Sequence, residues 1–304
     1  MAAPAIRLGT RTSRLARWQT EHVISLLSAA WPHLACITVP FVTKGDKTLD
    51  KPLPEIGGKG LFTAELEAAL NAGEIDLAVH SLKDLPVDDA PGLTIGAIPG
   101  RADVRDVVVA ADGLGLASLP AGAVVGTSSV RRRAQLLACR PDLHIQSIRG
   151  NVETRIRKVM EEYGYAATVL AMAGLERLSL AEHASDVLDL NRMLPAPGQG
   201  ALAVQCRRDD ETTKTLLAAI EQAETRACVT AERAFLHALG GGCSAPIAAY
   251  ATVDGAGLLT LNGLVGAVDG SLLLRVDGSG RDPHGLGTEL AADVLAQGAA
   301  ALLQ

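Results

Sequence analysis

Three adjacent arginines follow a short polar turn in the middle of an acidic chain. The segment GTSSVRRRAQL (126–136) lies where an apolar run ends and a helical pattern begins. Hydroxyls and unpaired backbone N–H groups at the first turn of a helix bind anions. Positive side chains there oppose the helix dipole by a few tenths to about 1 kcal/mol each. We therefore expect an anion among the side chains of this turn, which are Thr127, Ser128, Ser129, Arg131 and Arg132.

Further arginines occupy similar junctions between strand and helix. Residues 126–158 hold eight Lys or Arg and two Asp or Glu, although the formal net charge of the chain is −6. The junctions carry Arg11 beside Ser13, Arg149 at a strand end and Arg155 in a first helical turn. Such strand ends bind ligands in open α/β sheets, and guanidinium groups pair with carboxylates or phosphates. The pattern predicts a site for a polyanion, with a solvated basic face as the alternative.

A carboxylate and an ammonium group follow another strand directly. Lys83 and Asp84 lie in HSLKDLP, immediately after the apolar run IDLAV. From this heptapeptide alone, the simpler interpretation is a surface ion pair contributing about 0–1 kcal/mol. In an arginine-rich cleft, Asp84 would instead be a lone carboxylate, suited to accept ring N–H bonds or to stabilise developing positive charge.

One cysteine lies in a glycine-rich turn. Cys243 occurs in LGGGCSAPIA, between three glycines that end a helix and a proline that precedes a strand. An ordinary exposed thiol and a covalent attachment point both fit this setting. The other cysteines lie in apolar patterns and are expected to be packed; they are Cys36, Cys139, Cys206 and Cys228. Wide spacing without C-x-x-C, and histidines without ligand spacing, predict neither a disulfide framework nor a metal site.

Alternating strand and helix patterns must position these residues, and they predict an α/β fold with parallel sheets covered by helices on both faces. IRLGTRTSRLARWQ resembles AVVGTSSVRRRAQL, and IDLAVHSLKDL resembles TVLAMAGLERL, which predicts two similar lobes facing a cleft. A lysine- and glycine-rich stretch at 43–60 predicts an exposed loop. A helical pattern runs from about Thr212 to Leu239, three short strands follow, and a final helix runs to Leu303.

Two junctions rich in proline and glycine suggest where the chain crosses between lobes. They are PGR at 99–101 and LPAPGQG at 194–200. We expect a first domain of residues 1–99 and 200–218, a second of residues 100–199, and a smaller α+β domain of residues 219–304.

Composition excludes several functional classes. No run of eighteen apolar residues is present, so no membrane span is expected. The first residues lack the apolar core of a signal peptide, which predicts a cytoplasmic protein. Aromatic residues make up 3% of the chain and the pI is about 5.7, which argues against a nucleic-acid binder.

Taken together, these motifs resemble the porphobilinogen deaminase (hydroxymethylbilane synthase) family over nearly the whole chain. They run in the order RLGTRTSRLARWQ, GGKGLF, DLAVHSLKDLP, VGTSSVRRRAQL, IRGNVETR, LPAPGQGAL, TAERAF and GGCSAPIA. The resemblance implies three domains, two of them like the lobes of periplasmic binding proteins. It also implies a monomeric transferase that joins four porphobilinogen units head to tail, releases ammonia and yields a linear tetrapyrrole.

The resemblance further implies residue roles. The family's catalytic aspartate falls on Asp84, and a dipyrromethane cofactor would be held by a thioether to Cys243. The implied contacts with cofactor or substrate are Arg11, Ser13, Lys59, Phe62, Ser81, Lys83, Thr127, Ser128, Ser129, Arg131, Arg132, Arg149, Gly150, Arg155, Arg177 and Gln199. Arg14 stands where the family often has proline, and Glu55 replaces a lysine found in some lid loops, which puts a substrate contact there in doubt.

Two other classes of function remain open from the residues alone. A non-enzymatic bilobal protein that binds a polycarboxylate would use the same lobes, but it would carry no pyrroles on Cys243. A nucleic-acid binder using residues 126–158 would show duplex affinity that falls steeply with salt.

Overall fold

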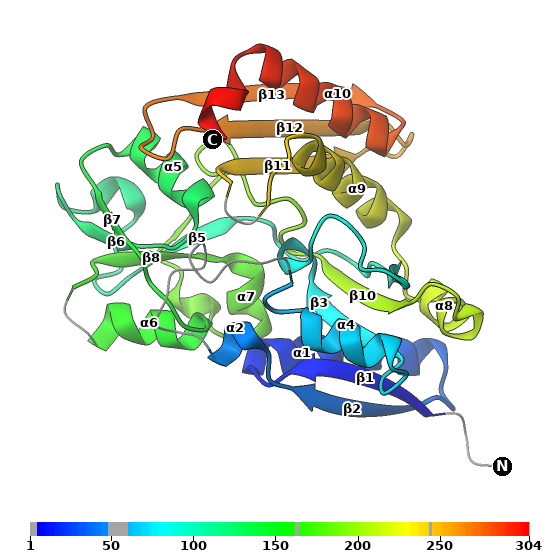
Figure 1. The fold of residues 1–304 in the computed structure, drawn as a ribbon. Coiled ribbons are helices and arrows are strands. Elements are labelled where there is room, and N and C mark those ends of the chain that lie inside the picture. The colour runs from blue at the N-terminus through cyan, green and yellow to red at the C-terminus, as the bar shows by residue number, and fades with distance from the viewer. Residues whose placement is uncertain (1–4, 48–59, 162–163, 243–244, 304) are drawn as a thin grey trace. The chain divides into compact units, whose positions relative to one another are not determined.

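The computed structural model describes residues 5–47, 60–161, 164–242 and 245–303. The chain divides into two compact units, coloured by residue number in Figure 1. The first unit comprises Met1–Lys51, Gly57–Ala102 and Ala201–Arg226. The described residues of the second unit lie within Asp103–Gly200 and Ala227–Gln304.

The first unit contains a five-stranded sheet in the order β2-β1-β3-β10-β4. Its strands are β1 (Ala5–Arg11), β2 (Ala35–Phe41), β3 (Leu77–Ser81), β4 (Leu93–Ala97) and β10 (Leu202–Arg207). β1 is parallel to β2 and β3, whereas β10 is antiparallel to both β3 and β4. The helices are α1 (Arg14–Ala30), α2 (Lys44–Lys47), α4 (Ala64–Asn71) and α8 (Glu211–Ala218).

Helices cover both faces of this sheet. Val23 and Leu27 of α1 and Leu217 of α8 pack with Val79 of β3 in one apolar cluster. Leu66 and Leu70 of α4 pack with Ala78 in another. Because neighbouring residues of a strand point to opposite faces, these two clusters lie on opposite sides of the sheet.

The second unit contains a sheet of the same design, in the order β7-β6-β8-β5-β9. Its strands are β5 (Asp106–Ala110), β6 (Val124–Gly126), β7 (His144–Gln146), β8 (Ala167–Ala171) and β9 (Asp186–Val187). Its helices are α5 (Val130–Cys139), α6 (Val152–Glu161) and α7 (Met172–Arg177). In the first sheet β1 lies between its parallel neighbours β2 and β3, and in the second sheet β6 lies between its parallel neighbours β7 and β8. An antiparallel strand, β10 or β5, then pairs with β3 or β8. The predicted similarity of the two lobes is therefore confirmed at the level of topology.

The predicted parallel pairing is confirmed for β1 with β2 and β3 and for β6 with β7 and β8, whereas β10 and β5 run antiparallel to their neighbours. Parallel pairing needs a crossover connection within the same sheet, usually through a helix. β10 instead enters the first sheet from the segment that ends at Gly200, and β5 enters the second sheet from the segment after β4.

A smaller α+β part completes the second unit. The three predicted strands are confirmed as β11 (Ile247–Val253), β12 (Leu259–Gly266) and β13 (Leu273–Gly280), and the structure shows that they pair antiparallel. The helices α9 (Ala223–Ala238) and α10 (Pro283–Ala296) share an apolar core with this sheet. The continuous helix predicted over 212–239 is two helices, separated by a turn after Ala218. The final helix ends at Ala296, because Gly298 adopts a φ of 98° before a short 3₁₀ turn. The three-domain boundaries stay a prediction.

The hairpin between β12 and β13 packs closely on α5. Gly270 has a φ of 77°, and a Cβ there would lie 2.5 Å from the backbone nitrogen of Ala138. A Cβ on Gly266 would lie 3.1 Å from that of Ala134. The small sheet is thereby held against the helix that carries the three arginines.

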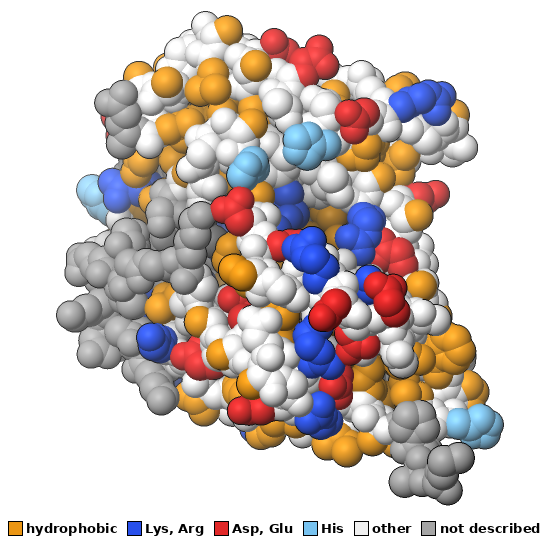
Figure 2. Space-filling view, turned by 45° about the vertical axis from the view of Figure 1, so that its right-hand side comes forward, with side chains coloured by type: hydrophobic (Ala, Val, Ile, Leu, Met, Phe, Trp, Pro, Cys, Tyr) orange, Lys and Arg blue, Asp and Glu red, His pale blue; other side chains and the backbone are white. Residues whose placement is uncertain are grey.

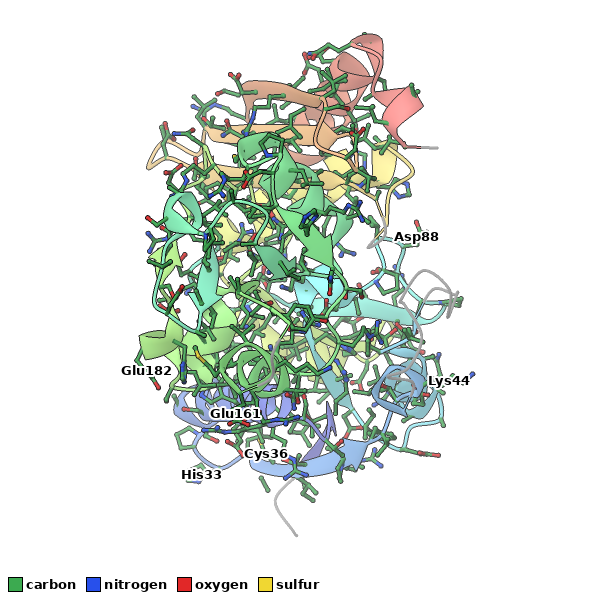
Figure 3. All side chains as sticks on the ribbon, turned by 90° about the vertical axis from the view of Figure 1, so that its left-hand side faces the viewer. His33, Cys36, Lys44, Asp88, Glu161 and Glu182 are labelled. Carbon is green, nitrogen blue, oxygen red and sulfur yellow. The ribbon has the colours of Figure 1, made fainter. Side chains whose placement is uncertain are left out.

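Other predictions concern the loop and the cysteines. Lys44–Lys47 forms the short helix α2 within the stretch predicted as a loop, and residues 48–59 lie outside the described part. Among the described residues, Cys36, Cys139 and Cys206 form no disulfide. Cys139 is exposed and Cys36, labelled on β2 in Figure 3, is half-buried, so the expectation that they are packed holds only for Cys206 and Cys228. No helix in the described ranges is long and apolar enough to cross a membrane.

Candidate functional site

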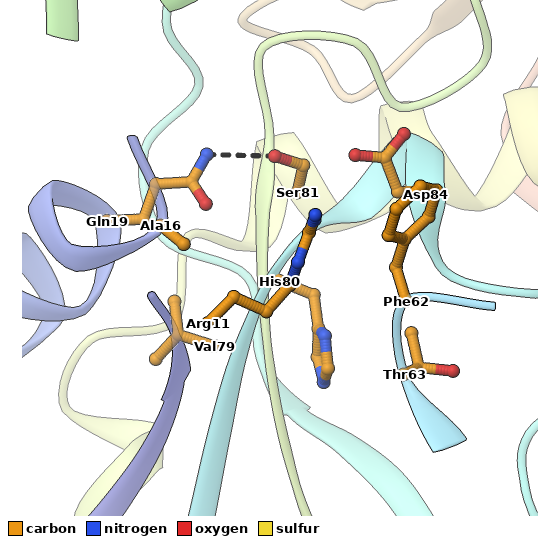
Figure 4. A pocket seen from close by; sticks show the side chains of 9 residues that line it. All are labelled: Arg11, Ala16, Gln19, Phe62, Thr63, Val79, His80, Ser81 and Asp84. Carbon is orange, nitrogen blue, oxygen red and sulfur yellow. Dashed lines mark hydrogen bonds between the residues drawn. The ribbon is translucent and has the colours of Figure 1, made fainter. Parts of the chain in front are cut away.

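A pocket in the first unit brings four predicted residues together, namely Arg11, Phe62, Ser81 and Asp84. Figure 4 shows them with the other side chains that line the pocket, which are Ala16, Gln19, Thr63, Val79 and His80. Arg11 ends β1 and Ser81 ends the neighbouring parallel strand β3. The predicted position at the carboxyl edge of the sheet is therefore confirmed for Arg11 and for Asp84, which lies in the turn after Ser81.

Local packing fixes the position of Asp84. A single 3₁₀ turn, η1 (Leu82–Asp84), follows β3. Leu82 is fully buried, and its N–H donates to the carbonyl of Ala201. The turn is thus anchored by its first residue, while Asp84 itself is exposed.

Arg11 and Ser81 have defined partners in this pocket. The guanidinium carbon of Arg11 lies 4.4 Å from the centre of the Phe62 ring, a cation–π contact. Gln19 Nε2 donates to Ser81 Oγ at 2.8 Å. Ser13 and Lys83 do not line the pocket; Ser13 Oγ instead caps α1 by accepting from the N–H of Ala16.

His80 is a buried titratable group of the same pocket, with 5% of its surface exposed. Burial lowers the pKa of His80 to about 4, and the positive charge of Arg11 acts in the same direction. The imidazole is therefore neutral at neutral pH.

In the second unit, Asp106 gathers two of the adjacent arginines. Arg131 Nη1 donates to Asp106 Oδ2 at 2.7 Å, and Arg132 Nη2 donates to Oδ1 at 2.7 Å. Gln199 Nε2 donates to the same Oδ1 at 2.9 Å. Asp106 is fully buried, and the two arginines are 5% and 6% exposed. The sequence predicted an anion beside the three adjacent arginines. Asp106 of the chain itself supplies part of that negative charge.

Backbone carbonyls complete this cluster. Arg131 Nη1 also donates to the carbonyl of Leu194, and Arg132 Nη1 donates to that of Val169. Burial alone would raise the pKa of Asp106, but the two guanidinium groups outweigh it and hold this pKa well below its usual range. Burial lowers the pKa of Arg131. Two guanidinium groups against one carboxylate leave one net positive charge, which suits an anionic ligand.

The hydroxyls of the turn before α5 are engaged in local structure. Ser129 Oγ caps α5 by accepting from the N–H of Arg132 at 3.4 Å. The N–H of Ser129 donates to Thr127 Oγ1 at 3.2 Å. Ser128 Oγ donates to the carbonyl of Ile148 and bonds with Ser147 Oγ, both at 2.8 Å. These bonds hold the backbone of the turn in one geometry.

Three further predicted residues occupy defined positions in the second unit. Arg155 Nε donates to the carbonyl of Gly150 at 2.9 Å. Gly150 has a φ of 117°, and a Cβ there would lie 2.6 Å from Thr154 Cγ2. Arg177 Nη2 donates to the carbonyl of Gly200 at 2.7 Å, and burial lowers the pKa of Arg177 to about 10. Arg149 is half-buried after β7.

The structure therefore brings Arg11, Phe62, Ser81 and Asp84 together in the first unit, and Arg131, Arg132 and Gln199 together around Asp106 in the second. Lys59 and Cys243 lie outside the described residues. In the ranges that are described, no group of three or more His, Cys, Asp or Glu side chains is placed to hold a metal ion.

Sequence reasoning missed Asp106 and His80. Asp106 opens the run DVVVA, whose five residues are all buried, and a charge at the head of such a strand signals an internal partner. His80 lies one residue before Ser81 in the singled-out motif, and it shares the Ala78 face of β3. That face is covered by α4, which the motif alone does not show.

Positive charge is not gathered into a broad patch on the face shown in Figure 2, where Lys and Arg intermix with Asp and Glu. A nucleic-acid interface needs a basic stripe or patch. This face therefore does not favour that alternative.

Comparison with protein families gives two matches that together cover most of the chain. Residues 6–215 match the model described as "Porphobilinogen deaminase, dipyromethane cofactor binding domain". Residues 226–296 match the model described as "Porphobilinogen deaminase, C-terminal domain".

Curated relatives match over nearly their full length. A porphobilinogen deaminase of Syntrophotalea carbinolica is 51% identical, over 100% of this chain and 96% of its own. Those of Brevibacillus brevis and Moorella thermoacetica are 50% and 52% identical, each over 98% of this chain and 96% of their own.

More distant solved structures are also similar. They include the BenM effector-binding domain with benzoate, at 14% identity and a TM-score of 0.44, covering 72% of this chain and 91% of that one. The periplasmic aliphatic sulphonate-binding protein SsuA from Escherichia coli matches at 14% identity and a TM-score of 0.41, covering 77% and 70%.

Proposed function

Because this chain belongs to the porphobilinogen deaminase family, we propose that Asp84 is its catalytic carboxylate and that its arginine groups hold the carboxylates of cofactor and substrate. The enzyme is a transferase of tetrapyrrole biosynthesis. It condenses four porphobilinogen molecules head to tail, releases ammonia and gives the linear tetrapyrrole hydroxymethylbilane. The full-length similarity to enzymes favours this function over a non-enzymatic polycarboxylate-binding protein.

The observation that carries the role of Asp84 is the composition of the first-unit pocket. Asp84 is the one acidic side chain among the nine that line it, and Arg11 is the one permanently charged cation. A carboxylate suits pyrrole N–H groups and the positive charge that develops as the amine departs. Binding the cationic species more tightly than the neutral ring lowers the barrier. Arg11 would take a substrate carboxylate.

The cofactor of this family is dipyrromethane, attached through a cysteine thioether, and we assign the attachment to Cys243. When bound, it supplies the primer that is extended. The residues fit a group with several carboxylates, because the second-unit cluster keeps a net positive charge after Asp106 is counted. The remaining proposed contacts are Ser13, Lys59, Phe62, Ser81, Lys83, Thr127, Ser128, Ser129, Arg131, Arg132, Arg149, Gly150, Arg155, Arg177 and Gln199.

The residues of this set have different roles according to the chemistry of their side chains. Arginines pair with carboxylates through two parallel N–H donors. The serine and threonine hydroxyls order the turn that presents Arg131 and Arg132. Phe62 restricts Arg11 by stacking under its guanidinium.

We also propose that the enzyme works as a monomer in the cytoplasm. The free thiols of Cys36, Cys139 and Cys206 fit a reducing compartment. Sedimentation of the purified enzyme at micromolar concentration should give a single species near 31.5 kDa.

Two measurements test the assignment. Asp84→Asn should keep the far-UV circular dichroism and the bound cofactor but lose more than nine-tenths of turnover. Asp89→Asn changes a nearby exposed aspartate that pairs with Arg208 at 3.3 Å, and it should stay within about twofold of the parent. An Asp84→Asn enzyme with more than about a tenth of the parent rate would refute the catalytic role.

Intact mass spectrometry tests the attachment position separately. The purified protein should exceed its sequence mass by two linked pyrrole units. That excess should vanish in Cys243→Ala and persist in Cys139→Ala, which changes a cysteine that the structure shows exposed. A Cys243→Ala protein that keeps the excess would move the attachment elsewhere.

A further inference from the structure

The side-chain amide of Gln135 binds both polar backbone groups of one residue, Leu194. Gln135 lies in α5 and is fully buried. The N–H of Leu194 donates to Gln135 Oε1 at 2.7 Å, and Gln135 Nε2 donates to the carbonyl of Leu194 at 3.0 Å. Gln135 belongs to the segment GTSSVRRRAQL, but the proposed function gives it no role. Its bonds are to the chain itself, so any role in the reaction must act through Leu194.

Leu194 depends on this side chain because its own segment offers few backbone partners. It is buried, but it lies in neither a helix nor a strand. The prolines at positions 195 and 197 have no N–H to donate. The next residue is held by β11, since the carbonyl of Pro195 accepts from the N–H of Ala249 at 3.1 Å. Without Gln135, the buried N–H of Leu194 would lose the partner that the structure shows for it, which is unfavourable.

The carbonyl of Leu194 is shared with Arg131. Arg131 Nη1 donates to this carbonyl at 2.7 Å and to Asp106 Oδ2 at 2.7 Å. Arg131 and Gln135 are four residues apart in α5, so their side chains lie on the same face of the helix. A carbonyl oxygen has two lone pairs, and that of Leu194 accepts one bond from each side chain. Arg131 Nη1 thus uses one hydrogen on a carboxylate and the other on a carbonyl whose position Gln135 sets.

The remaining donors of Arg131 are the ones that a bound carboxylate would need. Nε and Nη2 carry parallel N–H groups, the fork that pairs with the two oxygens of a carboxylate. Arg131 makes no bond from Nε or Nη2 to any residue that the structure describes. Arg132 differs, because its Nε and Nη2 both donate to Asp106 Oδ1, at 3.2 and 2.7 Å. Arg131 therefore keeps an unused fork, and the orientation of this fork depends on where Nη1 is held.

We propose that Gln135 is a positioning residue of this enzyme: by fixing the carbonyl of Leu194, it orients the unused fork of Arg131 toward a carboxylate of the cofactor or the substrate. Nη1 is held from two sides, and a guanidinium group is planar and rigid. A shift of the carbonyl would therefore turn the whole group about its bond to Asp106. This inference rests on the proposed role of Arg131 as a carboxylate ligand.

Two substitutions and a matched control separate this role from a contribution to folding alone. Gln135→Met keeps the size of the side chain but removes both bonds to Leu194. Gln135→Asn keeps an amide that is one methylene too short to reach both groups, and it replaces the methionine variant if that protein does not fold. Ser185→Ala is the control, because Ser185 Oγ likewise accepts from the N–H of Ala110 at 3.0 Å and donates to its carbonyl at 3.5 Å. No bond joins Ser185 or Ala110 to Arg131 in the described part of the chain.

The first measurement follows Arg131 itself in the holoenzyme, without substrate. Because both hydrogens of Nη1 are bonded, this group should rotate slowly about its bond to Cζ and give two separate proton resonances. Spectra of ¹⁵N-arginine-labelled protein record them, and Arg131→Lys identifies them by their loss. In Gln135→Met the two resonances should merge or broaden beyond detection, whereas in Ser185→Ala they should stay separate. The proposal is overturned if the parent lacks this pair of resonances or if Gln135→Met retains it.

The second measurement shows which carboxylate Arg131 binds. If it binds the cofactor, the fraction of purified Gln135→Met that carries two linked pyrrole units in its intact mass should fall about threefold or more. If it binds the substrate, the KM for porphobilinogen should rise about fivefold or more while kcat changes less than about twofold. Ser185→Ala should match the parent in both quantities, and equal losses in the two variants would overturn the proposal.

The two measurements together distinguish a failure of this inference from a failure of the proposed function. Unchanged Arg131 resonances in Gln135→Met overturn the role of Gln135 alone. Merged resonances with the occupancy and KM of the parent would show that Arg131 holds no carboxylate, which overturns its proposed role and with it the role of Gln135 in the reaction. Neither result affects the turnover test of Asp84→Asn.

Discussion

Asp106 Oδ2 accepts a hydrogen bond from Arg131 Nη1 at 2.7 Å, inside the second unit and with the carboxylate fully removed from solvent. The same carboxylate binds Arg132. This carboxylate offsets the unfavourable placement of cations in the first turn of α5. Asp106 is therefore a positioning residue, because it fixes both guanidinium groups before any ligand arrives.

Removing that charge should destabilise the second unit. Asp106→Asn leaves two buried guanidinium groups without a carboxylate, and breaking a buried ion pair costs about 3–5 kcal/mol. The free energy of unfolding in urea should fall by that amount. Asp103→Asn is the control, because its pair with Arg105 at 2.6 Å is exposed and should contribute less than about 1 kcal/mol. Equal losses in the two variants would contradict the role of Asp106.

Phe62 should act on substrate affinity through Arg11. Phe62→Leu removes the aromatic face under the guanidinium, a contact contributing about 0.5–2 kcal/mol. We expect the KM for porphobilinogen to rise about threefold to tenfold while kcat changes less than twofold. Phe62→Tyr keeps the ring and should restore the parent KM. Steady-state kinetics of the parent and both variants measures these constants. Equal KM values for Phe62→Tyr and Phe62→Leu would refute the role of the aromatic ring.

His80 should make stability depend on pH in a defined window. Its pKa is about 4 in the folded state and 6.5 when unperturbed, so the unfolded chain binds the extra proton between these values. The stabilisation is complete above pH 6.5 and is lost as the pH falls to about 4. Over that range the parent should lose on the order of 3 kcal/mol more than His80→Gln. Urea unfolding at half-unit pH steps measures this difference, and parallel curves for the two proteins would refute it.

Gly270 should tolerate no side chain. In Gly270→Ala, the added Cβ would lie 2.5 Å from the backbone nitrogen of Ala138. The φ of 77° at this position is also unfavourable for alanine. Gly257 has a similar φ of 75°, but the nearest atom to an added Cβ is the flexible end of Arg281, at 3.6 Å. Gly270→Ala should therefore lower the free energy of unfolding by at least about 2 kcal/mol more than Gly257→Ala. Matching values would show that the hairpin does not press on α5.

Much of the fold could be predicted because local signals and global packing agree. The three short strands that follow the helical pattern ending at Leu239 and the similarity of the two lobes both follow from patterns within a few residues. The direction of β5 and β10 could not be predicted, because strand polarity depends on partners distant in sequence. The break after Ala218 was missed because the apolar periodicity continues through it.

The residue types of the candidate site could be predicted from the sequence. The buried residues that bind them within the chain could not. The arginines were identified as binding residues, yet Asp106 is 25 residues from Arg131 in sequence and carries no motif of its own. Thr63 and His80 likewise come to line one pocket only when α4 covers one face of β3. Burial from folding, rather than any local pattern, created both relationships.

The place of β10 sets an order of events during synthesis. β10 is the neighbour through which β4 joins the first sheet, and it is not complete until residue 207. The second sheet, in contrast, is encoded without interruption between residues 106 and 187. On the ribosome, the strands of the second sheet therefore emerge in full while the first sheet still lacks β10, its fifth and last strand to be synthesised. The sheet that begins the chain is thus the later one to be completed.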